Sequence, residues 1–148
     1  MTMRILCRIL VTVGSAVTIC LGLWHFFIPK IWDWYSYISP NAPELVIAVR
    51  AINMFFSLCL VLFGVVNILF IHGTNSNRYS VTVMLSATSI LWLVRSVLQV
   101  AYPQGSQNPA IQYGMLVLFI ATLLCFSVPL LIISSQKRGL VERNRKGL

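Results

Sequence analysis

The sequence predicts an all-α membrane protein: one domain that is an antiparallel bundle of four transmembrane helices. Of its 148 residues, 58% are hydrophobic and only 9% are charged, whereas charged residues make up about 25% of a soluble domain. Four apolar segments each supply the roughly 20 residues that a helix needs to cross ~30 Å of hydrocarbon. The alternation with a period of two that marks a membrane barrel is missing. The expected spans are residues 5–27, 46–71, 80–101 and 111–134, and residues 135–148 form a basic tail.

The first span has the features of a retained helix rather than those of a cleaved signal peptide. Arg4 and Arg8 precede its apolar run, as basic residues do in signal peptides. The run is longer than a signal peptide needs, however, and it ends in residues 24–29, which are aromatic and apolar, instead of a small-residue cleavage site. The segment 29–38 that follows is rich in Trp and Tyr, which prefer the headgroup level of a membrane. We therefore expect this segment to lie along the membrane surface.

Short connections join the remaining spans. Residues 72–78, between the second and third spans, contain the Gly, Asn and Ser that turns favour. Residues 103–109 link the third span to the fourth. Because short links favour antiparallel neighbours, the sequence predicts an up-down-up-down arrangement.

Basic residues are concentrated on one side of this four-span arrangement. The other side has only Lys30 together with the acids Asp33 and Glu44. This distribution follows the positive-inside rule, which predicts a multi-pass membrane protein with both termini in the cytoplasm. The net charge of +8 then serves topology and contact with anionic lipid headgroups rather than nucleic-acid binding. The concentrated basic residues are Arg4, Arg8, Arg78, Lys137, Arg138, Arg143, Arg145 and Lys146.

Three spans carry a stripe of polar or small residues at spacings of three and four, which places each stripe on one helix face. Because lipid-facing surfaces are apolar, we expect the stripes to face the bundle interior, where polar side chains bond across helices. The fourth span offers only Gly114, Ala121 and Cys125, and we expect it to serve as packing. The stripes are Arg8, Val11, Ser15, Thr18, Gly22, His25 and Pro29; Arg50, Asn53, Ser57, Leu60, Gly64 and Asn67; and Thr88, Trp92, Arg95, Gln99 and Tyr102.

Arg50 and Arg95 are each the only charged residue in a long apolar stretch, residues 45–77 and 79–136 respectively. A guanidinium in the middle of a membrane helix costs about 2.5–3.5 kcal/mol on insertion scales. The expected spans place Arg50 about 6 Å and Arg95 about 9 Å inside the outer ends of their helices. His25 lies within one turn of the same end, and two amide side chains lie nearby. The sequence therefore predicts a net basic ligand-binding site near the outer face, made of His25, Arg50, Asn53, Arg95 and Gln99.

Three interpretations of the two arginines stay open. Each side chain could snorkel, with its stem in lipid and its head among phosphates. Each could instead pair structurally with Glu44, with Asp33 or with backbone carbonyls. The third interpretation is a ligand site for an anionic or strongly hydrogen-bond-accepting group, such as a lipid phosphate, a carboxylate or a quinone carbonyl.

The sequence identifies no catalytic residue, no metal site and no cofactor site. His25 and His72 lie about a membrane thickness apart at opposite ends of their spans, so they cannot share a haem. No second His or Cys accompanies either of them to hold a metal. The spans also contain no carboxylate with which to build a proton relay.

Two short stretches carry a resemblance to a known family. Gly22-Leu-Trp-His25-Phe-Phe-Ile-Pro29 closes the first span, and Arg95-Ser-Val-Leu-Gln99 lies in the third. With the aromatic segment between them, they resemble the DoxX-like group of small four-helix bacterial membrane proteins. Those proteins have a Gly-x-x-His-Phe-x-x-Pro stretch in the same place and an Arg-x-x-x-Gln in a late helix. The resemblance implies a bacterial inner-membrane protein, in some members an accessory to redox or stress systems.

These observations lead to a small integral membrane protein and to two classes of function. The leading hypothesis is a non-enzymatic accessory protein, or a lipid- or anionic-ligand-binding protein, with a basic polar pocket near the outer face. The alternative is a small membrane oxidoreductase or lipid-modifying enzyme that uses His25 with Arg50 and Arg95 on a quinone or a lipid headgroup. The expected partners are membrane lipids, with a protein partner or a second copy of the chain as further candidates.

Overall fold

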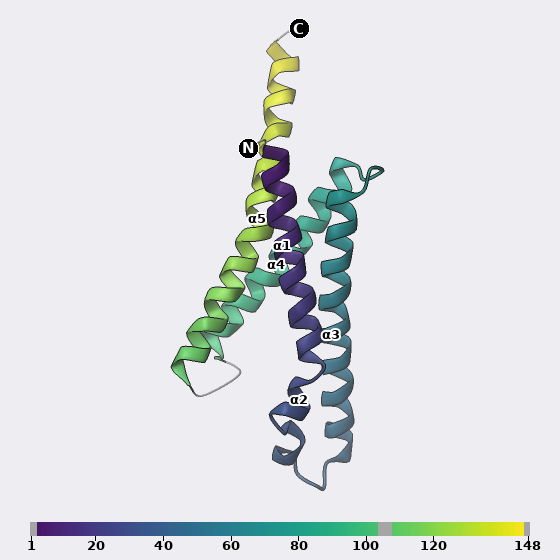
Figure 1. The fold of residues 1–148 in the computed structure, drawn as a ribbon, viewed down its shortest axis with the longest axis vertical. Coiled ribbons are helices and arrows are strands. Elements are labelled where there is room, and N and C mark those ends of the chain that lie inside the picture. Colours follow the sequence, from purple (N-terminus) through teal and green to yellow (C-terminus); the bar gives the residue numbers. More distant parts are fainter. Residues whose placement is uncertain (1–2, 104–107, 147–148) are drawn as a thin grey trace. The chain divides into compact units, whose positions relative to one another are not determined.

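Long helices dominate the part of the chain that the structure describes (Figure 1). The structure is a computed structural model that describes residues 3–103 and 108–146, the last ten of these by their backbone only. The long helices are α1 (Met3–His25), α3 (Pro43–His72), α4 (Arg78–Ala101) and α5 (Pro109–Lys146). Two short helices, α2 (Ile28–Ile31) and the 3₁₀ helix η1 (Trp34–Tyr37), follow α1 in the segment expected to lie along the membrane surface.

The predicted all-α fold with four membrane-length helices is confirmed. Within the described residues, α1, α3, α4 and the Pro109–Gln136 part of α5 are each long and apolar enough to cross a membrane, and these residues contain no strand. The protein is therefore a small multi-pass integral membrane protein. Each long helix begins two or three residues before the expected span, since the first turn of a helix accepts residues of lower apolarity. Pro43 and Pro109 are the first residues of their helices, where the missing N–H of proline removes no helical hydrogen bond. Asn77 caps α4, because its side chain accepts a hydrogen bond from the Ser80 amide at 2.8 Å.

Two expected features fall partly outside the described residues. Of the connection expected at 103–109, residues 104–107 lie outside them. Of the basic tail expected at 135–148, residues 147 and 148 lie outside them, as do the side chains of 137–146. The backbone of α5 remains helical through Lys146, well beyond the end of the span expected at residue 134.

The chain divides into two compact units, each with its own core. Unit 1 comprises Met1–Gly14 and Asn67–Leu148, and unit 2 comprises Ser15–Val66. Helices α1 and α3 contribute to both units. Unit 2 also contains α2 and η1, and unit 1 contains α4 and α5.

Unit 2 depends on a close approach of α1 and α3 at two glycines. A Cβ atom on Gly22 would lie 2.9 Å from the backbone oxygen of Ser57, and one on Gly64 would lie 2.8 Å from the backbone oxygen of Ser15. These pairings run in opposite directions along the two helices, so α1 and α3 are antiparallel here. Both glycines belong to the predicted stripes. Their lack of a side chain brings the two backbones into contact, as small residues do between membrane helices.

Unit 1 is held by aromatic packing between α4 and α5. These helices lie side by side and run antiparallel (Figure 1), and the rings of Trp92 and Phe119 are 5.6 Å apart between centroids. Phe126 is fully buried, and a Cβ atom on Gly14 of α1 would lie 3.1 Å from its ring. At the other end of the pair, the Arg78 guanidinium donates to the Ile133 carbonyl.

Helix α5 packs through one of the three residues expected from the sequence. The Cβ atom of Cys125 lies 2.7 Å from the place that a Cβ atom on Gly14 of α1 would take. A Cβ atom on Gly114 would meet nothing within 4 Å, and Ala121 is exposed. Phe119 and Phe126 supply further contacts, which no polar residue marked in the sequence, because these packing residues are as apolar as those that face lipid.

We predict that Gly64→Ala destabilises the protein, because the new Cβ atom would press on the backbone of α1 at Ser15. The expected loss is about 1–3 kcal/mol of unfolding free energy, the usual cost of overpacking. Gly114→Ala is the matched control, since its new methyl group enters open space and gains up to about 1 kcal/mol of helix propensity. Reversible unfolding in mixed micelles measures both. Equal effects of the two substitutions would contradict the close helix approach.

Candidate functional site

The five predicted site residues fall into two groups. His25, Arg50 and Asn53 belong to unit 2, where α1 and α3 carry them, and Arg95 and Gln99 belong to unit 1, where α4 carries them. The structure joins His25 to Asn53 and places Arg95 and Gln99 one turn apart on α4, whereas Arg50 contacts Tyr35. Each group therefore has its own partners and its own chemistry.

His25 and Asn53 form a bonded pair between α1 and α3. The Asn53 amide nitrogen donates to the backbone carbonyl of His25 at 2.9 Å, and the Asn53 Oδ1 lies 3.4 Å from the His25 Nδ1. With Asn53 oriented in this way, Nδ1 is the nitrogen that carries the proton. The His25 ring also stands edge-on to Phe56, with centroids 5.0 Å apart. His25 therefore ends α1 and ties it to α3, which is a structural role.

Arg50 differs from the rest of its stripe. Asn53, Ser57 and Asn67 are buried as predicted, whereas the Arg50 side chain is exposed. Its guanidinium carbon lies 5.2 Å from the centroid of the Tyr35 ring in η1, which is within cation–π range. The prediction that Arg50 turns inward is thus wrong, because an aromatic side chain from the short 3₁₀ helix gives the cation a partner at the surface. Arg50 lies seven residues after the start of α3, or about 10 Å along the helix rather than the expected 6 Å.

Arg95 is the charged group that unit 1 encloses. Its side chain is half-buried, and its guanidinium carbon lies 4.4 Å from the centroid of the Phe119 ring in α5. The Nη1 nitrogen is shielded from solvent and has no hydrogen-bond partner among the described residues. Arg95 lies six residues before the end of α4, which is about 9 Å along the helix, as expected.

Polar residues next to Arg95 share its inward orientation. Gln99, one turn further along α4, is only 3% exposed. Ser96 is also buried, and its hydroxyl donates to the Trp92 carbonyl at 2.8 Å. The stripe of α4 is confirmed as an inward face, except that Tyr102 at its end is 70% exposed.

The electrostatic surroundings of Arg95 make its enclosure unusual. The sequence has only three acids, of which Asp33 and Glu44 belong to unit 2. The third, Glu142, has a side chain outside the described part of the chain. No described side chain of unit 1 can therefore supply Arg95 with a carboxylate. The Phe119 face stabilises the cation but accepts no directional hydrogen bond from Nη1.

Sequence reasoning missed the two aromatic partners of the arginines. Tyr35 and Phe119 lie far from Arg50 and Arg95 in sequence, and neither belongs to a polar stripe. A possible signal was the aromatic content of segment 29–38 for Tyr35, but no comparable signal marks Phe119. In the described residues, no group of three or more His, Cys, Asp or Glu side chains comes together. The site residues offer hydrogen-bonding groups from His25, Asn53 and Gln99, and positive charge from Arg50 and Arg95.

We predict that Asn53→Leu costs more stability than His25→Phe. Asn53→Leu removes both bonds between the helices, which are worth about 0.6 kcal/mol each in membrane proteins. His25→Phe keeps the backbone carbonyl that accepts from Asn53, and it keeps an aromatic edge against Phe56. Unfolding in mixed micelles gives both values. A loss on His25→Phe as large as that on Asn53→Leu would assign the imidazole a role beyond this contact.

No protein-family model, curated protein or solved structure matches the chain.

Proposed function

We propose that this multi-pass membrane protein is a non-enzymatic accessory protein that binds an anionic or strongly hydrogen-bond-accepting ligand at Arg95. One observation carries the proposal: the enclosed Arg95 Nη1 has no acceptor among the described residues. A buried charged donor left without a partner costs more than the 1–3 kcal/mol of a neutral group. A ligand that accepts from Nη1 removes that cost.

The surroundings of Arg95 favour a particular kind of ligand. The guanidinium carbon lies over the Phe119 ring, 4.4 Å from its centroid, and this contact leaves N–H groups along the planar edge of the guanidinium to form hydrogen bonds. A planar edge of this kind matches the oxygens of a phosphate or a carboxylate. A lipid phosphate, a carboxylate and a quinone carbonyl all present such oxygens at this depth in a membrane. Gln99, one turn away on the same helix face, adds an amide group.

The surroundings of His25 favour a binding protein over an enzyme. His25 is the histidine that the alternative of an oxidoreductase or lipid-modifying enzyme would use as its acid–base group. Its Nδ1 is engaged by Asn53, and its carbonyl holds the same side chain. An imidazole used to join two helices is poorly suited to exchange protons with a substrate.

The distribution of charge supports an orientation. We place both termini in the cytoplasm, because eight basic residues lie on the side of the termini against one on the other. We also propose membership of the DoxX-like group, on the Gly22-to-Pro29 and Arg95-to-Gln99 stretches, and with it a location in the plasma (inner) membrane of a bacterium. Membrane lipids are then the constant partners, and the exposed apolar faces can also receive a protein partner or a second copy.

We predict that Arg95→Leu lowers the amount of copurifying ligand at least tenfold, because a hydrogen bond to a charged group is worth about 1.5–3 kcal/mol. Arg50→Leu is the matched control: it removes the same charge at a similar depth along a helix, but from an exposed side chain. Mass spectrometry of extracts from the folded proteins measures the ligand. We expect Arg50→Leu to stay within about twofold of the natural chain. Equal loss in both variants, or full retention in Arg95→Leu, would contradict the proposal.

The orientation makes a separate prediction. A fluorescent reporter fused after Leu148 should be active, and a phosphatase that needs export should be inactive at the same position, because the basic side of the chain stays in the cytoplasm. The reverse pattern would place the Arg95 end of α4 on the cytoplasmic face. A fusion in the segment 38–42 serves as the internal control, and there the phosphatase should be active.

A further inference from the structure

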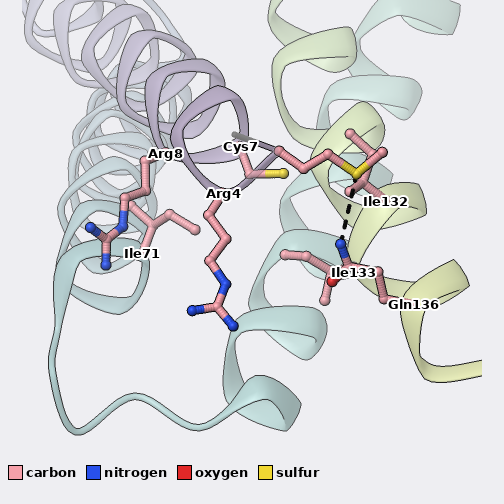
Figure 2. A pocket seen from close by; sticks show the side chains of 8 residues that line it. Arg4, Cys7, Arg8, Ile71, Ile132, Ile133 and Gln136 are labelled. Atoms are coloured by element: carbon pink, nitrogen blue, oxygen red, sulfur yellow. Dashed lines mark hydrogen bonds between the residues drawn. The ribbon is translucent and has the colours of Figure 1, made fainter. Parts of the chain in front are cut away.

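A basic pocket of about 130 Å³ lies within unit 1 (Figure 2). The first turns of α1, the last turn of α3 and the later part of α5 form its walls. Arg4, Cys7 and Arg8 come from α1, Ile71 from α3, and Ile132 and Ile133 from α5. The pocket is thus cationic on one wall and apolar on the others.

The two arginines of the pocket are cations without a matching anion. Arg4 and Arg8 are four residues apart, so they lie on one face of α1, and Figure 2 shows both side chains at the pocket. Like charges at this spacing repel each other. No described side chain of unit 1 is acidic, because Asp33 and Glu44 belong to unit 2. An anion between the two guanidinium groups would relieve this repulsion.

Two further features reinforce the positive potential at the pocket. The first turn of α1 contains no acidic residue, so the partial positive charge of its backbone amides is not offset. A third cation, Arg78, donates to the carbonyl of Ile133, which itself lines the pocket. Met3 and Gln136, which also line the pocket, contact each other at 3.8 Å through sulfur and amide nitrogen. These two side chains supply no negative charge.

The apolar walls of the pocket favour a ligand with a hydrocarbon part over a free ion. Ile71, Ile132 and Ile133 present hydrocarbon directly beside the arginines. A free phosphate, fully hydrated, gains nothing from such walls. A phospholipid presents a phosphate and an acyl chain side by side and so satisfies both. The location, at helix ends and beside membrane-spanning apolar segments, is where lipid headgroups lie.

From this geometry we propose that the pocket binds an anionic phospholipid, with its phosphate between Arg4 and Arg8 and its glycerol and first acyl carbons against the isoleucines. This site is independent of Arg95, so each can fail without the other. It would anchor the first turn of α1 to α5 through a bound lipid. The basic residues at this end then do more than set topology, because two of them form a defined site.

The test titrates the full-length protein in detergent with short-chain phosphatidylglycerol and phosphatidylcholine. We expect the natural chain to bind phosphatidylglycerol at least about tenfold more tightly than phosphatidylcholine. Arg4→Gln with Arg8→Gln should reduce that affinity about tenfold. Arg143→Gln with Arg145→Gln removes the same charge from the tail and should change it less than about twofold. Both double variants keep Arg95, so a difference between them separates this site from the proposed function.

Several outcomes would overturn the proposal. Equal losses in the Arg4/Arg8 and Arg143/Arg145 variants would mean diffuse attraction, and competition by inorganic phosphate would mean an ion site. If the Arg4/Arg8 variant fails to fold, a photoactivatable phosphatidylglycerol answers the question in the natural chain. It should label peptides that contain residues 3–8 and 132–136. Labelling confined to the tail would overturn the lipid site.

Discussion

The absence of water in hydrocarbon is the constraint on which this structure depends. A polar side chain inside a membrane must find its hydrogen bonds within the protein, and most described ones do so in one of two ways. The hydroxyls of Ser57, Ser96 and Thr122 donate to the carbonyl four residues earlier, at 2.7, 2.8 and 2.7 Å. Asn67 instead reaches across helices, to the Thr88 hydroxyl at 2.8 Å. The stripes thus decide which helix faces meet, and glycines decide how closely.

Neither a carbonyl four residues earlier nor a single bond across helices can satisfy the hydrogen-bonding groups of a guanidinium, since it carries five N–H groups and a charge. The two arginines inside the spans resolve this differently. Arg50 is exposed, and its guanidinium lies over the Tyr35 ring. Arg95 is enclosed over Phe119 with a buried nitrogen that lacks an acceptor among the described residues. The contrast between two otherwise similar arginines is the physical basis for placing a ligand at one of them.

The sequence predicted those features that follow from local periodicity. Inward faces at Ser15, Ser57 and Thr88 follow from helical spacing and the cost of polar groups in lipid, and all three are buried. The outward turn of Arg50 could not be predicted, because it depends on where η1 places an aromatic ring. No feature of the sequence marked Phe119 as a packing residue of α5, since the residues that face lipid are equally apolar. The pocket at Arg4 and Arg8 could not be predicted from the sequence, because three helices that are distant in sequence form it.

The most direct measurement is an experimental structure, determined from protein extracted with its native lipids, at a resolution that identifies the neighbours of Arg95 Nη1. The account predicts an acceptor atom that does not belong to the chain, at a hydrogen-bond distance of about 2.7–3.2 Å. The guanidinium carbon should remain over the Phe119 ring. A guanidinium whose bonds all go to carbonyls or side chains of the protein itself would contradict the account, because Arg95 would then be a structural residue like His25.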